Sequence, residues 1–126
     1  MKSVIIAEDN KYLREIYICC IEEKVKDITI DEVENGSALI EKVKENNYSL
    51  ILTDNKMLGG INGLQAIEKI REFNKDIPIY LLCTLDKEKA IDLKKNPEKY
   101  GINEFIDKGD DNFSSKLVKI INKHLK

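Results

Sequence analysis

The stretch Ser-Leu-Ile-Leu-Thr-Asp at residues 49–54 decides the fold of this chain. It is a short, mostly apolar run without helical spacing, and it ends on a carboxylate. A continuous run of this kind is typical of a strand buried on both faces, as the central strands of a parallel sheet are. Two similar runs, at residues 4–7 and 79–83, lie before and after it. Together the three runs predict three central strands.

Amphipathic segments separate these runs and continue to the end of the chain. Their apolar residues recur three or four positions apart, which predicts helices. A more charged helix is predicted at 86–96, ending before Pro97. Two weaker strands complete the pattern, a mixed and half-exposed one at 28–33 and a short one at 103–107. The apolar positions that define the other helices are Leu13, Ile16, Tyr17, Cys20 and Ile21; Leu39, Ile40 and Val43; Leu64, Ile67 and Ile70; and Phe113, Leu117, Ile120 and Ile121.

Strand and helix alternate five times, so the predicted fold class is α/β, a (βα)5 doubly wound parallel sheet with helices on both faces. The mixed strand at 28–33 suits an edge, which gives the strand order 2-1-3-4-5. A chain of 126 residues has the size of one domain, and we expect a single domain over residues 1–126. In such sheets a site forms beyond the carboxyl ends of the strands, between the first and the third.

The composition argues against several classes of function. The net charge is −2, from 21 basic and 23 acidic residues, so we expect no direct nucleic-acid binding. No apolar run approaches the roughly 20 residues of a membrane-spanning helix, and the first residues form no signal-peptide core. The three cysteines include no CxxC pair and predict no zinc site. We therefore expect a cytoplasmic protein.

Five polar residues stand at the ends of the predicted strands. Glu8 and Asp9 follow the first strand, Asp54 the third, Thr84 the fourth and Lys108 the fifth. Each alone has an ordinary explanation as a helix cap or a turn residue. The topology, however, brings all five to one edge of one sheet, where a site is expected. We interpret them as one functional constellation.

The chemistry of this constellation indicates phosphoryl transfer. Three carboxylates held close together repel one another, by about 1 kcal/mol per pair at 4 Å even in water. A divalent cation and the lysine would bring the total charge to zero, and Mg²⁺ (or Mn²⁺) suits oxygen ligands. We interpret Glu8 and Asp9 as metal ligands and Asp54 as the nucleophile. Lys108 would offset phosphoryl charge, and Thr84 would donate a hydrogen bond.

At these residues the chain resembles the receiver domain of bacterial two-component response regulators, of the chemotaxis-regulator type, over essentially all 126 residues. That family has an acidic pair after strand 1, an Asp after strand 3, Thr or Ser after strand 4 and Lys after strand 5. The spacings of 30 from Asp54 to Thr84 and 24 from Thr84 to Lys108 suit the family. Thr84 and Phe105 match its switch positions. The resemblance implies a flavodoxin-like fold.

The resemblance also implies a phosphoprotein that acts as a signalling switch. A sensor histidine kinase or a phosphotransfer protein would donate a phosphoryl group to Asp54. Mg²⁺ would be held by Asp9, Asp54 and the backbone carbonyl of Lys56, with Glu8 acting through a bound water. The chain would be no enzyme in the ordinary sense, since it assists only its own phosphorylation and dephosphorylation.

The family further implies partners without specifying them. An output domain or a downstream protein would read the phosphorylated state on the face formed by the fourth helix, the fifth strand and the fifth helix. A homodimer is compatible with the family as well. The cognate kinase, the signal and the output do not follow from the residues.

Four positions depart from the family pattern and bear on rate more than on chemistry. Leu58 stands where proline is common, and Gly63 lies nine residues after Asp54 instead of eight, which predicts a longer and more mobile loop. Leu85 replaces a small residue, and we expect it to narrow access to the site. Gly109 replaces the proline that normally follows the lysine. Because a cis Lys-Gly bond would cost roughly 3 kcal/mol, we expect a trans bond and a less firmly placed lysine.

Three other interpretations fit parts of the pattern. A flavin-binding protein shares the topology, but it needs a Ser/Thr/Gly-rich phosphate loop where residues 8–10 are acidic or amide. A phosphatase of the haloacid-dehalogenase type uses a nucleophilic Asp, but it needs a second acid where Lys56 stands. A degenerate receiver that binds partners without phosphorylation is the alternative that Leu85 and Gly109 leave open.

Overall fold

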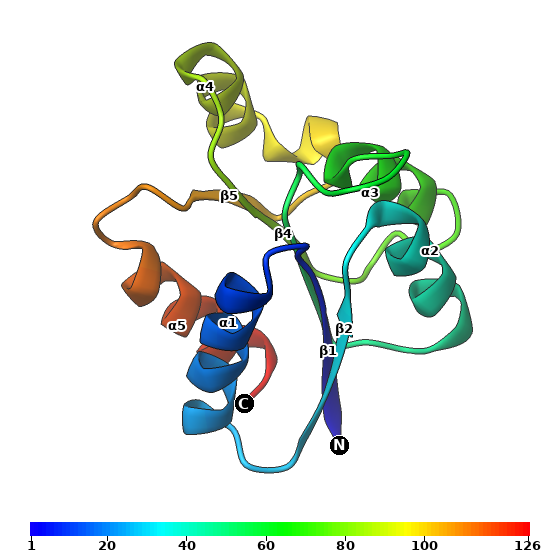
Figure 1. The fold of residues 1–126 in the computed structure, drawn as a ribbon, viewed down its shortest axis with the longest axis vertical. Helices are drawn as coiled ribbons and strands as arrows, with labels where there is room; N and C mark the ends of the chain where they lie inside the picture. Colours follow the sequence, from blue (N-terminus) through cyan, green and yellow to red (C-terminus); the bar gives the residue numbers. More distant parts are fainter.

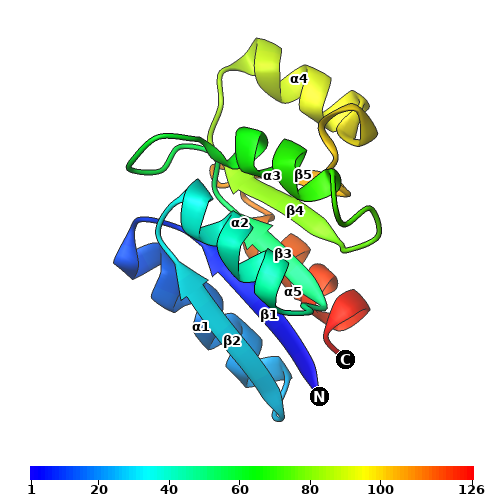
Figure 2. The same cartoon turned by 90° about the vertical axis from the view of Figure 1, so that its right-hand side faces the viewer.

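The computed structural model describes residues 1–126 and contains one five-stranded parallel sheet in the order β2-β1-β3-β4-β5. The predicted fold class and strand order are confirmed, and the mixed strand lies at an edge, as Figure 2 shows. The strands are β1 (Lys2–Ala7), β2 (Ile28–Val33), β3 (Leu50–Thr53), β4 (Ile79–Cys83) and β5 (Glu104–Asp107).

Helices connect the strands, and side-chain caps fix where four of them begin. Asn10, Asn35, Asn62 and Asp86 each accept a hydrogen bond from the backbone N–H three residues further on. A cap of this kind satisfies a donor that the first helical turn leaves unpaired. The helices are α1 (Lys11–Lys24), α2 (Gly36–Glu45), α3 (Gly63–Arg71), α4 (Lys87–Lys95), the short 3-10 helix η1 (Pro97–Tyr100) and α5 (Phe113–His124).

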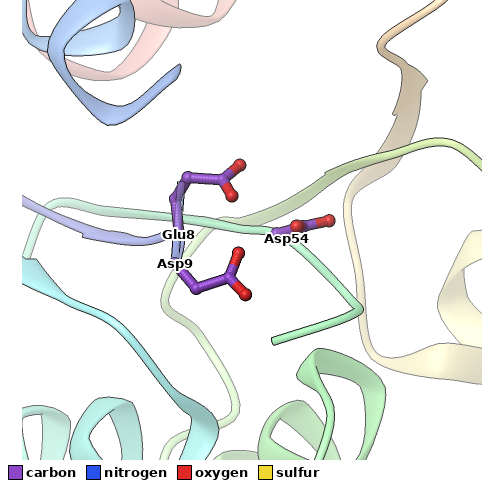
Figure 3. Close-up of side chains that lie close together, drawn as sticks. All are labelled: Glu8, Asp9 and Asp54. Carbon is purple, nitrogen blue, oxygen red and sulfur yellow. The ribbon is translucent and has the colours of Figure 1, made fainter. Parts of the chain in front are cut away.

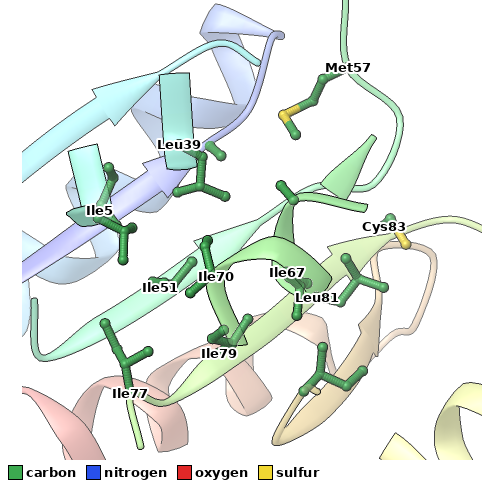
Figure 4. Packing of buried hydrophobic residues seen from close by; sticks show 14 of the residues in the cluster. Ile5, Leu39, Ile51, Met57, Ile67, Ile70, Ile77, Ile79, Leu81 and Cys83 are labelled. Carbon is green, nitrogen blue, oxygen red and sulfur yellow. The ribbon is translucent and has the colours of Figure 1, made fainter. Parts of the chain in front are cut away.

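The helices cover both faces of the sheet. Figure 1 shows α1 and α5 on one face and α2 and α3 on the other, while α4 lies at the β5 side. Two hydrophobic cores result, because alternate residues of a strand point to opposite faces. Ile51 of β3 packs with Ile67 of α3 in the first core, part of which Figure 4 shows. Leu52 packs with Tyr17 and Leu117 in the second core, under α1 and α5.

The register of the strands places the functional positions at one level. β1 and β3 pair so that Ala7 lies opposite Thr53, and the Asp54 N–H donates to the Ala7 carbonyl at 2.9 Å. On the other side, the Lys108 N–H donates to the carbonyl of Cys83 at 3.1 Å. The segments that follow β1, β3, β4 and β5 therefore leave the sheet at the same edge.

The loop after β3 returns to the end of that strand at Gly63, whose N–H donates to the Asn55 carbonyl at 2.7 Å. A Cβ atom at Gly63 would lie only 2.1 Å from the Asp54 carbonyl oxygen, so this close approach needs glycine. Within the loop, Gly59 adopts a φ of 82°, in the left-handed region. No peptide bond is cis, which confirms the trans bond expected between Lys108 and Gly109. None of the helices has both the length and the apolar composition that a membrane span needs.

Candidate functional site

An acidic cluster lies at the carboxyl end of the sheet, where β1 and β3 stop. Glu8, Asp9 and Asp54 each offer an oxygen atom, and these atoms all lie within 4.8 Å of one another. Figure 3 shows the three side chains next to each other. Glu8 is only 1% exposed and Asp54 8%, whereas Asp9 is half-buried. The structure thus brings together the three acids named from the sequence.

Lys108 reaches into this cluster from the end of β5. Its Nζ lies 2.7 Å from Oε1 of Glu8 and 3.3 Å from Oδ2 of Asp54. The other oxygen of Asp54, Oδ1, accepts the N–H of Asn55 at 2.7 Å. Although glycine follows Lys108, its ammonium group forms ion pairs with two carboxylates of the cluster.

Burial and repulsion both act on the cluster. The pKa of Glu8 is raised above its ordinary value, first because burial disfavours the charged carboxylate and also because Asp54 is nearby. The hydrogen bond from Lys108 opposes this shift. Three ionised carboxylates and one lysine together carry a formal charge of −2. The all-oxygen set of ligands fits a hard divalent cation, which would supply the missing positive charge.

Arg14 of α1 holds the segment after β1 that carries Glu8 and Asp9, and it is not among the site residues expected from the sequence. Its nearly buried guanidinium donates from Nη1 to the Glu8 carbonyl at 2.7 Å and from Nε to the Glu32 carboxylate at 2.8 Å. It thereby ties the loop after β1 to β2. The signal was available, since Arg14 precedes Tyr17 by three positions and so shares the buried face of the helix. A cation on such a face is rarely without a specific partner.

The other residues named from the sequence form no side-chain hydrogen bond or ion pair with the three acids. Thr84 is exposed at the end of β4, and Lys56 is exposed in the loop after β3. Phe105 of β5 is buried in the first core, and the half-buried Leu85 packs against that core. Cys83 stays a neutral thiol, because burial and the charge of Asp54 raise its pKa to about 12.

These features define a class of protein: doubly wound α/β domains with a site of carboxylates and a lysine between β1 and β3, where the strand order reverses. The family model of the response regulator receiver domain matches residues 4–122. The chain therefore belongs to the response regulator receiver domain family. Members of this family are signalling switches of two-component systems rather than enzymes with a separate substrate.

Individual relatives agree with this assignment. The chain is 27% identical over 107 residues to the chemotaxis protein CheY of Halobacterium salinarum, covering 85% of this chain and 84% of that protein. It is 28% identical over 105 residues to the uncharacterized transcriptional regulatory protein YkoG of Bacillus subtilis, covering 83% of this chain and 43% of that protein. The chain thus spans less than half the length of this second relative.

Solved structures show the same fold. The response regulator protein TrrA of Thermotoga maritima, solved in complex with Mg²⁺-BeF, superposes with a TM-score of 0.77 at 27% identity over 98% of each chain. The chemotaxis response regulator CheY4 of Vibrio cholerae superposes with a TM-score of 0.78 at 18% identity, over 98% of each chain. The second likeness speaks for the fold alone.

Proposed function

We propose that this chain is a phosphorylation-controlled switch in which Asp54 accepts a phosphoryl group in a reaction that depends on Mg²⁺ or Mn²⁺. The position of Lys108 carries the proposal, because its ammonium group bridges Glu8 and Asp54 at 2.7 and 3.3 Å. One oxygen of Asp54 is held by a backbone N–H and the other faces this cation. A nucleophile that meets a charged phosphoryl group needs such an environment.

The acidic cluster supports a divalent cation at this site. Asp9, Asp54 and the backbone carbonyl of Lys56 would hold the ion, and Glu8 would act through a bound water. When bound, the cation supplies positive charge that offsets the oxygens of the phosphoryl group. The related protein from Thermotoga maritima, which was solved with Mg²⁺-BeF, gives this assignment further support.

The residues of the chain would share the phosphoryl transfer as follows. A carboxylate oxygen of Asp54 attacks phosphorus, and the bond from phosphorus to the donor breaks as the acyl phosphate forms. The leaving group of the donor keeps the electron pair. Lys108 turns from Glu8 toward the new phosphoryl oxygens, and the Thr84 hydroxyl donates to one of them. Attack of water on the acyl phosphate later returns free Asp54 and inorganic phosphate.

The phosphoryl donor would be a sensor histidine kinase or a phosphotransfer protein in the cytoplasm. Movement of Thr84 toward the phosphoryl group would bias the chain between two conformations, with Phe105 as the second switch residue. An output domain or a downstream protein would read the change on the face of α4, β5 and α5, where Ile91 is exposed. The degenerate alternative has less support, because Lys108 reaches both acids although glycine follows it.

The proposal is tested by weighing the intact chain after incubation with acetyl phosphate and Mg²⁺. One phosphoryl adduct is expected, and it should disappear in Asp54→Asn or in the presence of a chelator. Asp86→Asn is the matched control, because Asp86 only caps α4 and asparagine caps a helix equally well. An unmodified wild-type chain, also when a histidine kinase is the donor, would refute the proposal, and so would an undiminished adduct in Asp54→Asn.

A further inference from the structure

The hydroxyl group of Tyr17 is the one buried side-chain polar atom of the chain that has no hydrogen-bond partner. The residue is only 2% exposed and belongs to the second core. Its ring packs against Phe113 of α5, with ring centroids 6.0 Å apart. An unpaired buried hydroxyl lowers stability, and buried polar groups in proteins are nearly always paired. An unpaired buried hydroxyl of this kind points to a hydrogen-bond partner in another state of the protein.

The geometry of α1 directs this hydroxyl toward the acidic cluster. Side chains of a helix lean toward its N-terminus, and the N-terminus of α1 follows directly on Glu8 and Asp9. Arg14, one turn earlier on the same face, already reaches the Glu8 carbonyl. The pKa of Tyr17 is raised, chiefly by burial and then by the negative charges of Glu8 and Asp54, which agrees with this direction of the side chain.

The Glu8 carboxylate can accept more hydrogen bonds than it does. Its Oε1 accepts from Lys108 at 2.7 Å, and its Oε2 accepts from the Asn10 N–H at 3.2 Å. A carboxylate offers about four acceptor positions, so room for another donor is left. If Lys108 turns to a phosphoryl group, Oε1 loses its only partner while it stays buried.

We propose that the Tyr17 hydroxyl is a positioning residue of the site, which donates a hydrogen bond to the Glu8 carboxylate in the cation-bound and phosphorylated states. It would keep Glu8 oriented toward the cation when Lys108 leaves it. This inference rests on the proposed function, because it assumes a cation beside Glu8. It assigns the residue a role through Glu8, and no contact with the phosphoryl group.

The test compares Tyr17→Phe with the wild-type chain, using Mg²⁺ alone as the probe. Phenylalanine keeps the ring and its packing on Phe113 and removes only the hydroxyl. The Mg²⁺ dissociation constant, followed by amide chemical shifts in an NMR titration, should rise roughly tenfold, as expected for one hydrogen bond to a charged acceptor. In the absence of Mg²⁺, the urea midpoint of Tyr17→Phe should be unchanged or higher, because an unpaired polar atom is lost.

Tyr80→Phe is the matched control, because Tyr80 lies in the same core and its hydroxyl is bonded to His124 at 2.8 Å. It should lose stability and keep the Mg²⁺ affinity. In a Glu8→Gln background, Tyr17→Phe should add little to the loss of affinity. Equal Mg²⁺ affinity of wild type and Tyr17→Phe would overturn the inference alone. Failure of the wild-type chain to bind Mg²⁺ would instead remove the proposed function, and the inference with it.

Discussion

Gly63→Ala is the substitution for which the structure gives the most definite expectation. The new methyl carbon would lie 2.1 Å from the Asp54 carbonyl oxygen and 3.0 Å from the Cα of Asn55. Real contacts of this kind begin near 3.0 Å, so the end of β3 and the start of α3 must separate by about 1 Å. The obstacle is backbone, which has no flexible end to swing aside.

Two consequences of this displacement can be measured separately. Overpacking of this sort costs typically 1–3 kcal/mol of unfolding free energy, and the better helix propensity of alanine at this position offsets less than about 1 kcal/mol of it. A shift of about 1 Å at a reacting group costs up to about 100-fold in rate. We therefore expect Gly63→Ala to lower the unfolding free energy by about 2 kcal/mol and the rate of Asp54 phosphorylation by tenfold or more.

The assay pairs urea denaturation, followed by far-UV circular dichroism, with the initial rate of adduct formation in the intact-mass experiment. Gly60→Ala serves as the control, because a Cβ there meets no atom within 4 Å and Gly60 has no positive φ. The control should be neutral or slightly stabilising. If Gly63→Ala matched Gly60→Ala in both stability and rate, the close approach of α3 to Asp54 would not hold Asp54 in place, and the reasoning would be refuted.

Three further predictions concern the cations of the chain. Arg14→Ala should lower the unfolding free energy by about 1–3 kcal/mol in urea denaturation, because the buried Glu8 carbonyl loses its hydrogen bond from Arg14. Lys69→Ala, which removes an exposed ion pair of 3.8 Å to Glu72, should change the unfolding free energy by less than about 0.5 kcal/mol. Lys108→Met should lower the unfolding free energy by roughly 2–4 kcal/mol near neutral pH, because it leaves the buried Glu8 without its cation, and Mg²⁺ should restore part of this loss. Lys116→Met, which removes a more exposed pair with Asp110, should lower the unfolding free energy by less than about 1 kcal/mol. The pKa of His124 is lowered from 6.5, chiefly by burial, so the folded state binds fewer protons than the unfolded state. The unfolding free energy should therefore fall as the pH drops below 6.5. In His124→Gln this part of the pH dependence should be lost, and an unchanged dependence of the unfolding free energy on pH would contradict the prediction.

The fold and the core of the site could be predicted from sequence because both depend on topology. Continuous apolar runs indicate central strands, and parallel strands bring their carboxyl ends to one edge whatever the details of packing. Asp54 and Lys108 could therefore be placed together although 53 residues separate them. Their contact distance, and the bridge to Glu8, depend on side-chain conformations that periodicity does not encode.

Contributions from the sides of helices were harder to predict. Arg14 and Tyr17 lie on the buried face of α1, yet apolar periodicity identifies such a face without saying how far a long side chain reaches along it. The spacing from Asp54 to Gly63 predicts a longer loop than the family has. The close approach of Gly63 to the Asp54 carbonyl depends on the conformation of the loop, in which Gly59 is left-handed. Residue spacing does not encode this conformation.

The ion pair between Glu8 and Lys108 joins residues 100 positions apart. Between their strands in the sheet lie β3 and β4, so the lysine cannot meet the acids before the last strand has docked. A chain still being synthesised thus contains its three acids, among them the proposed nucleophile Asp54, before it contains Lys108. On the proposed function, Asp54 would not accept a phosphoryl group efficiently until β5 has joined the sheet. Local unfolding of β5 in the folded protein would remove Lys108 from the site again. Docking of the last strand therefore completes both the sheet and the ion pair of the site.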